Sequence, residues 1–143
     1  MVDTLVSIIT PAYNAEAYLQ EAIASVQAQG YTNWEMIIVD DCSSDGTQRI
    51  ARRAAEQDAR IRYERLASNS GAAVARNRAL ELARGRYVAF LDADDRWKPK
   101  KLERQLAFME KNGYGFTLRG MRSSAGRGTA LFRCPRARTM FRR

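Results

Sequence analysis

Three carboxylates fall within four positions directly after an apolar run in the segment YVAFLDADD, residues 87–95. The apolar residues predict a buried strand, and a strand that ends in acids brings negative charge to the edge of a core. Alternate residues of an extended chain point to the same side, so Asp92 and Asp94 are expected to project together and Asp95 away from them. Neighbouring carboxylates repel each other unless a cation lies between them, which indicates a divalent metal that also binds substrate phosphates. The alternative is a solvated turn that caps the next helix.

Two other apolar runs also end in polar or acidic residues. The run 5–11 leads into the segment 11–14, and the run 34–41 ends in Asp40 and Asp41. In an open parallel sheet, ligands bind outside the carboxyl ends of the strands. We therefore expect these strand ends to converge with the acids of residues 92–95 on one cleft.

Strands and helices are predicted to alternate along the chain. Strands are expected at 5–11, 34–41, 61–66 and 87–92, helices at 14–30, 47–57, 70–84 and 98–112, and a fifth strand from 114. This alternation predicts βαβ units and a parallel sheet with helices on both faces.

Local signals refine the helix boundaries. Asn14 is expected to cap the first helix, and Pro99 is expected in the first turn of the last one. Helical spacing predicts one buried face, made of Tyr18, Leu19, Ala22, Ile23 and Val26.

The charge is unevenly distributed along the sequence. The net charge is +8, yet residues 118–143 contain eight Arg and no acids, so the first 117 residues are formally neutral. We expect one domain over 1–117 and a disordered Arg-rich tail after it. The tail is either a solvated basic segment or the translation of a GC-rich coding region in another frame.

Several classes of protein are disfavoured by composition. There are two isolated Cys and no His, which argues against zinc sites and disulfide scaffolds. No apolar run reaches the length of a membrane span, and no leader-like segment is seen at the N-terminus. The expected location is the cytoplasm, with peripheral attachment to the inner face of the membrane left open.

Four segments, taken together and in order, resemble the donor-binding part of the inverting glycosyltransferases of family 2. They are IITPAYNAEAYL (8–19), EMIIVDDCSSDGT (35–47), NSGAAVARNRAL (69–80) and GRYVAFLDADD (85–95). The resemblance covers about residues 4–117. It implies the GT-A fold of nucleotide-diphospho-sugar transferases: a Rossmann-like three-layer α/β/α sandwich with a mostly parallel sheet, here truncated after about the fifth strand.

The resemblance assigns roles to residues of the first two segments. It implies that Pro11, Ala12 and Tyr13 line a uracil pocket, with the Tyr13 ring as a stacking surface. A core tyrosine at a strand end is the alternative for Tyr13. Asp41 would accept a hydrogen bond from the uracil imide N–H, whereas Asp40 would support the loop or cap the helix that follows it.

The last two segments would hold the ribose and the diphosphate. Asp92 corresponds to a carboxylate near the ribose, and Asp94 to the ligand of Mn²⁺ or Mg²⁺. Arg76 would reach the nucleotide and either pair with Asp92 or neutralise the diphosphate; a solvent-facing helical Arg is the alternative. Asp95 is expected to be structural and to cap the last helix.

The chain departs from the family at the general base. An inverting transfer needs a base for the acceptor hydroxyl, and no acid follows Glu110. The leading hypothesis is thus a UDP-sugar-binding glycosyltransferase part whose base and site for a glycan or lipid-linked acceptor are missing. A non-catalytic nucleotide-binding or assembly module, which could form a homo-oligomer, is the second hypothesis. Nucleic-acid binding through the tail ranks last, because the body is neutral.

Overall fold

The computed structural model describes residues 4–113, 116–119 and 129–133. Strands and helices alternate through most of this part. In chain order they are β1 (Val6–Ala12), α1 (Leu19–Gln27), β2 (Trp34–Asp40), α2 (Thr47–Gln57), β3 (Ile61–Arg65), α3 (Ala72–Leu82), β4 (Tyr87–Phe90), α4 (Lys101–Asn112), β5 (Phe116–Arg119) and β6 (Thr129–Arg133). None of the described helices has the length and apolar character needed to cross a membrane.

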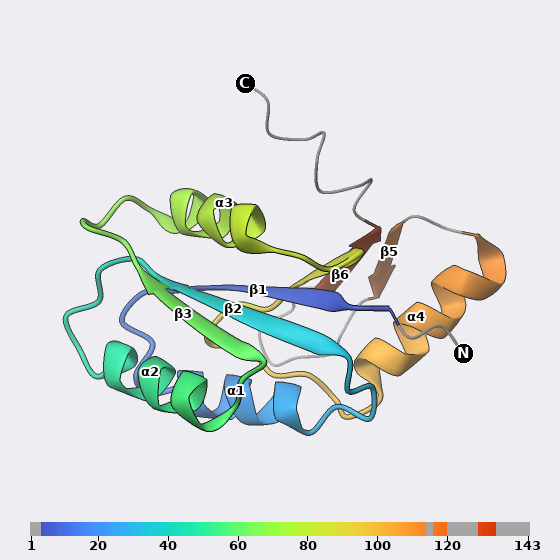
Figure 1. Cartoon of the computed structure of the whole chain (residues 1–143), viewed down its shortest axis with the longest axis horizontal. Helices are drawn as coiled ribbons and strands as arrows, with labels where there is room; N and C mark the ends of the chain where they lie inside the picture. The colour runs from blue at the N-terminus through green and yellow to red at the C-terminus, as the bar shows by residue number, and fades with distance from the viewer. Residues whose placement is uncertain (1–3, 114–115, 120–128, 134–143) are drawn as a thin grey trace.

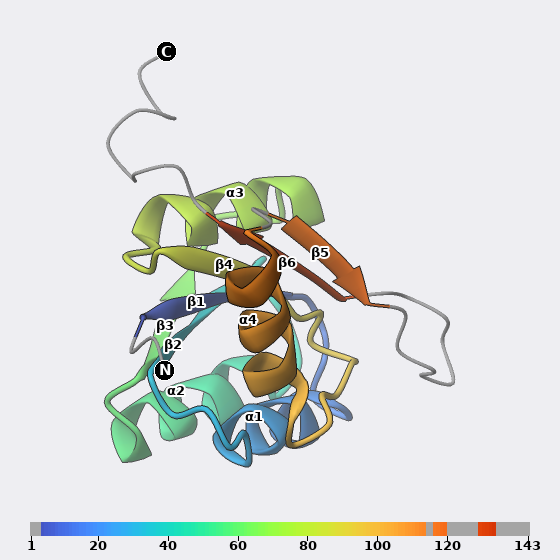
Figure 2. The ribbon, with the colours of Figure 1, turned by 90° about the vertical axis from the view of Figure 1, so that its right-hand side faces the viewer.

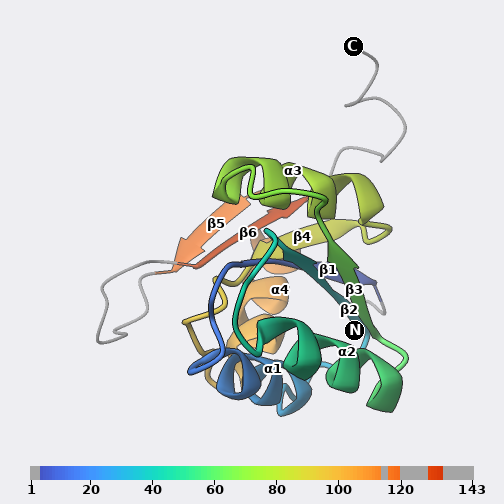
Figure 3. The ribbon, with the colours of Figure 1, turned by 90° about the vertical axis from the view of Figure 1, so that its left-hand side faces the viewer.

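The elements form three layers around one sheet (Figure 1). The strand order is β3-β2-β1-β4-β6-β5, in which the first four strands are parallel and β6 is antiparallel to both of its neighbours. Helix α3 covers one face, and α1 and α2 lie together on the other (Figure 3). Helix α4 packs on that second face near β5 (Figure 2). The predicted three-layer α/β/α sandwich with a mostly parallel sheet is confirmed.

Strands β1 and β2 form the centre of the core because helices cover both of their faces. All seven residues of β2 are buried. Alternate side chains enter opposite halves of the core: Ile8 and Met36 pack in the cluster with α1, α2 and α4, whereas Ile9 and Ile37 pack against α3. The nearly continuous apolar runs in the sequence reflect this two-sided burial.

Several predicted boundaries of helices and strands were wrong. Helix α1 begins at Leu19 without a side-chain cap, so Asn14 is not its N-cap. Tyr18 precedes the first helical residue and is 55% exposed, so it does not belong to the buried face of α1. Pro99 lies before α4, which begins at Lys101. Strand β4 ends at Phe90, two residues earlier than expected.

A sixth strand lies in the segment that was predicted to be disordered. Strand β6 pairs with β4 on one side and β5 on the other, and Leu131 is fully buried. The five residues TALFR are too few for the sequence pattern to predict a strand. They form one because the edge of β4 offers backbone partners for hydrogen bonding, so tertiary pairing decides the structure here. The rest of the predicted tail, 120–128 and 134–143, lies outside the described residues.

Lys101 is a buried cation in the first turn of α4. The residue is 6% exposed, and its Nζ lies 3.8 Å from the centre of the Trp97 ring. Nζ has no hydrogen-bond acceptor among the described residues. Burial lowers the pKa of Lys101 from 10.5 to about 7, because the ammonium loses its hydration there.

This burial predicts a pH-dependent stability. Between about pH 7 and 10.5, the unfolded chain holds a proton on Lys101 that the folded chain releases. The free energy of unfolding should therefore rise as the pH rises across this window, by at most about 1.4 kcal/mol per pH unit. Below the window, the folded chain carries the full cost of burying the Lys101 ammonium. Urea denaturation should find Lys101→Met more stable than the unsubstituted protein at pH 6, with a smaller difference at pH 9. An equal difference at both values would contradict this, and exposed Lys98→Met serves as control.

Candidate functional site

The strand order itself marks a place for a ligand. Strands β2 and β4 flank β1, so the chain continues from the carboxyl ends of β1 and β4 toward opposite edges of the sheet. Such a switch point leaves a crevice between the diverging loops. A pocket of about 340 Å³ opens there. It is lined by Pro11, Ala12, Tyr13, Asn14, Ala15, Tyr18, Asp41, Ala72, Ala75, Arg76, Asp92, Ala93 and Asp94.

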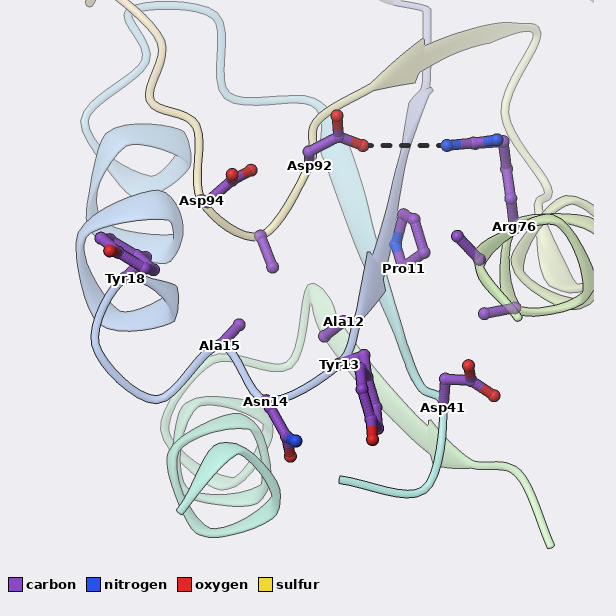
Figure 4. Close-up of a pocket in the computed structure, with 13 residues that line it drawn as sticks. Pro11, Ala12, Tyr13, Asn14, Ala15, Tyr18, Asp41, Arg76, Asp92 and Asp94 are labelled. Atoms are coloured by element: carbon purple, nitrogen blue, oxygen red, sulfur yellow. Dashed lines mark ion pairs between the residues drawn. The ribbon is translucent and has the colours of Figure 1, made fainter. Parts of the chain in front are cut away.

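The structure brings every predicted site residue to this one pocket (Figure 4). Three of them lie at the end of β1 or directly after it: Pro11, Ala12 and Tyr13. The other four come from the end of β2, from α3 and from the turn after β4: Asp41, Arg76, Asp92 and Asp94. Their roles toward a ligand stay predictions, whereas their convergence is a property of the fold.

Tyr13 projects from the end of β1 into the open side of the pocket. Its side chain is 54% exposed, which excludes the alternative of a core tyrosine. Ala72 and Ala75 of α3 line the same pocket with side chains that are only methyl groups. Small side chains in a pocket that also holds an exposed aromatic ring leave room for a flat group on that ring.

Asp41 is held in place by the loop that precedes α3. Its two carboxylate oxygens accept hydrogen bonds from the backbone N–H groups of Ser70, at 2.7 Å, and Gly71, at 2.9 Å. Gly71 takes a φ of +97°, which favours glycine. The carboxylate thus lies at the positive end of the α3 dipole, and each oxygen keeps a second lone pair for a ligand.

Asp40 connects the two loops that form one wall of the pocket, residues 13–18 after β1 and residues 41–46 after β2. It is fully buried, and its Oδ1 accepts hydrogen bonds from the backbone N–H and the hydroxyl of Ser43, at 2.9 and 2.5 Å. The Ser43 Oγ in turn accepts the N–H of Asn14 at 2.9 Å. Asp40 therefore supports the loop, as predicted.

Asp45 makes a second connection between the same loops. Its Oδ1 accepts hydrogen bonds from the N–H and the hydroxyl of Thr47, and the Thr47 Oγ1 accepts the N–H of Ala15 at 2.8 Å. Burial alone would raise the pKa of Asp45, but these hydrogen bonds lower it below its ordinary value. Positive φ values at Asn14 and Cys42 redirect the chain beside these anchors, a local strain that the hydrogen bonds offset.

The turn after β4 gathers three carboxylates. One oxygen each of Asp92, Asp94 and Asp95 lies within 4.8 Å of the others. The expectation that Asp95 points away and caps α4 was wrong. Extended alternation stops at Phe90, and a turn closed by the hydrogen bond from the Asp95 N–H to the Asp92 carbonyl, at 3.0 Å, follows. This turn brings Asp95 back toward the other two acids.

This turn, residues 92–95, is called the carboxylate turn below, and its ligand atoms suit a divalent cation. Two oxygens bound to one Mg²⁺ lie at most about 4.2 Å apart, since each metal–oxygen distance is about 2.1 Å. The three oxygens lie within 4.8 Å of one another, close to that range, and the Asp94 side chain is exposed. Hard oxygen ligands without nitrogen or sulfur suit Mg²⁺ or Mn²⁺.

Arg76 supplies the positive charge of the pocket. Its guanidinium lies 3.9 Å from the Asp92 carboxylate, with both side chains about two-fifths exposed. This pairing argues against the alternative that Arg76 is a helical arginine that only faces solvent. Arg78, two residues further along α3, instead pairs with Glu64 and Glu81 outside the pocket.

Sequence reasoning placed Asn14 at the cleft as part of the segment 11–14, but it missed five lining residues. Ala15 and Tyr18 continue the loop after Asn14, and Ala72, Ala75 and Ala93 are small. Helical spacing could have found the two alanines of α3, since Ala72 lies four residues before Arg76 and Ala75 lies three residues after Ala72, spacings that place residues on one side of a helix. Tyr18 was not recognised as a pocket residue because its ring fitted the apolar spacing of the predicted helix.

Comparisons with known proteins agree on one family. The model of the family "Glycosyl transferase family 2" matches residues 7–140. The chain is 54% identical over 127 residues to TuaG of Bacillus subtilis (strain 168), whose name assigns it to teichuronic acid biosynthesis as a glycosyltransferase; the match covers 89% of this chain and 50% of TuaG.

A second relative and a solved structure extend the picture. The Escherichia coli glucosyltransferase WfgD, named for UDP-Glc and a GlcNAc-diphosphoundecaprenol, is 47% identical over 81% of this chain and 45% of its own length. The structure of S. aureus TarS 1–349 with UDP-GlcNAc superposes with a TM-score of 0.79 and 33% identity, covering 86% of this chain and 36% of that one. The chain spans about half the length of the curated relatives it matches.

Proposed function

The chain belongs to glycosyl transferase family 2, and on that premise we propose that its pocket binds the nucleotide of a UDP-sugar donor together with a divalent cation. The observation that carries the proposal is the convergence of an exposed tyrosine, an arginine and acidic side chains from three strand ends on one pocket. Similarity to TarS, whose structure holds UDP-GlcNAc, supports the choice of nucleotide.

Each side chain has a task that its place in the pocket allows. The Tyr13 ring stacks on the uracil, and the free lone pairs of Asp41 accept its imide N–H. Asp92 accepts a hydrogen bond from a ribose hydroxyl, and Arg76 pairs with Asp92 beside the nucleotide. The ends of β1 and β2 thus hold the base, and the turn after β4 holds the phosphates.

Asp94 is the proposed principal ligand of Mn²⁺ or Mg²⁺, and Asp92 and Asp95 lie close enough to share it. When bound, such a cation stabilises the negative charge that develops on the departing diphosphate. The chain's own part is to keep the carboxylates together. It does so with the backbone hydrogen bond of the turn and the opposing charge of Arg76.

For the longer protein we propose transfer of the sugar to a glycan or lipid-linked acceptor at the inner face of the membrane. The diphosphoundecaprenol in the name of WfgD supports a lipid-linked acceptor. Within these 143 residues no acid follows Glu110. We propose that this chain alone binds the donor without transferring its sugar, and turnover by the purified chain would contradict that.

Titration calorimetry tests the proposed donor binding. UDP should bind with one-to-one stoichiometry, and Mn²⁺ should tighten the binding by at least about tenfold, because a cation held by the carboxylates of Asp92, Asp94 and Asp95 would offset the negative charge of the diphosphate. GDP serves as the control for the base, since the proposed base site presents the Tyr13 ring and the fixed Asp41 carboxylate to it. Equal affinities for UDP and GDP, or no binding of UDP, would refute the proposal.

A further inference from the structure

Tyr18 places a large aromatic ring on the pocket wall that the nucleotide does not use in the proposal above. The residue is 55% exposed, which is more than the intermediate burial usual for tyrosine. In Figure 4, it lies at the end of the pocket where Asp94 is, whereas Asp41 and Arg76 lie at the other end. The ring therefore borders the proposed metal ligand, away from the proposed base site.

The backbone of Tyr18 is held in place because it directly precedes helix α1 and is hydrogen-bonded to both sides. Its N–H donates to the Ala15 carbonyl at 3.0 Å, and its own carbonyl accepts the Ala22 N–H at 3.1 Å. These hydrogen bonds fix where the side chain leaves the backbone. Only rotation about side-chain bonds is left to the ring.

The carboxylate turn is fastened to the same helix. The Arg96 guanidinium pairs with Glu21 at 3.1 Å, and the Trp97 N–H donates to the Ser25 Oγ at 3.1 Å. Both anchors of α1 lie within two turns of Tyr18. The backbone segments that carry Tyr18 and Asp94 are thus held close to each other, which a site for a rigid ligand requires.

The order of the proposed ligand groups along the pocket leads to Tyr18. The base lies at Asp41 and the diphosphate at Asp94, so the group attached to the far phosphate extends beyond Asp94. In a UDP-sugar that group is the sugar. A tyrosine suits a sugar, because its ring covers the apolar C–H face and its hydroxyl can exchange a hydrogen bond with a sugar hydroxyl.

We propose that Tyr18 is a specificity-determining residue that contacts the sugar of the donor. This inference rests on the proposed function, because it takes the direction of the ligand from the nucleotide site. The rival explanation is that Tyr18 packs against a part of the longer protein that follows these 143 residues. That explanation predicts no role in donor binding by this chain.

Comparing ligands with and without the sugar tests the inference. In Mn²⁺, Tyr18→Ala should weaken the binding of UDP-glucose or UDP-N-acetylglucosamine by about five- to tenfold and that of UDP by less than about twofold. Tyr18→Phe should retain most of the affinity for the UDP-sugars, because it keeps the ring. Phe108→Ala removes an aromatic side chain of similar exposure outside the pocket, and it should change neither affinity.

The outcomes separate this inference from the proposed function. If UDP binds and Tyr18→Ala changes UDP and UDP-sugar affinities equally, or changes neither, Tyr18 does not contact the sugar and the inference is overturned. If the unsubstituted chain fails to bind UDP, the proposed nucleotide site itself is wrong. A thermal melt of each variant excludes misfolding, which is not expected for a side chain this exposed.

Discussion

Replacing Asp94 by alanine should abolish the effect of Mn²⁺ on UDP binding while leaving the metal-free affinity nearly unchanged. The substitution removes the most exposed of the three clustered carboxylates and with it the proposed principal ligand of the cation. The affinity for UDP in Mn²⁺ should fall by at least about tenfold, or about 1.4 kcal/mol. Calorimetric titration of UDP with and without Mn²⁺ measures both quantities.

The control for Asp94→Ala is Glu56→Ala. It removes the same charge from the exposed surface of α2, outside the pocket, and should change neither affinity. Asp95→Ala is informative as well, because the turn places its carboxylate near the other two. A retained Mn²⁺ effect in Asp94→Ala would contradict the proposed role of this residue, whatever Asp95→Ala shows.

Replacing Asp40 by alanine should destabilise the protein by about 3 kcal/mol and weaken UDP binding at the same time. The buried carboxylate accepts hydrogen bonds from Ser43 and, at 2.9 Å, from the Tyr63 hydroxyl. Burial first, and then the nearby Asp40 charge, raise the pKa of Tyr63 to about 12, so the hydroxyl stays a donor. Alanine leaves these donors unpaired, at about 1–3 kcal/mol each when buried.

Urea denaturation measures the loss of stability in Asp40→Ala, and calorimetry at a temperature where the variant is folded measures UDP affinity. Asp58→Ala is the control. Asp58 likewise accepts side-chain hydrogen bonds, in its case from Arg60 at 2.9 Å, but it lies at the end of α2 away from the pocket. It should cost about 1 kcal/mol or less and leave UDP binding unchanged. A stable Asp40→Ala variant with full UDP affinity would show that the loops keep their shape without this anchor.

The sheet and the positions of the site residues could be predicted from the sequence for a physical reason. A strand covered on both faces must be apolar along its whole length, so WEMIIVD and its counterparts stand out from their surroundings. In a parallel sheet the carboxyl ends share one edge, so acids that follow such runs necessarily meet there. The convergence of Asp41 and Asp94 on one pocket follows from these two facts.

Other features depend on contacts that a local pattern does not contain. The strand alternation that assigned Asp95 to the opposite side ended at Phe90, because the backbone turns there. Tyr18 matched the apolar face of α1 but precedes the helix, so its ring is exposed. Strand β6 forms because β4 offers it an edge, which no window of five residues reveals.

The position of a bound cation relative to a bound nucleotide tests the central claim most directly. Crystals of the chain grown with UDP and Mn²⁺ would locate the metal by its anomalous scattering and the uracil by its density. We predict manganese at the Asp94 carboxylate, the diphosphate beside it and the uracil between Tyr13 and Asp41. Manganese bound elsewhere, or UDP outside the pocket at the ends of β1, β2 and β4, would contradict the account.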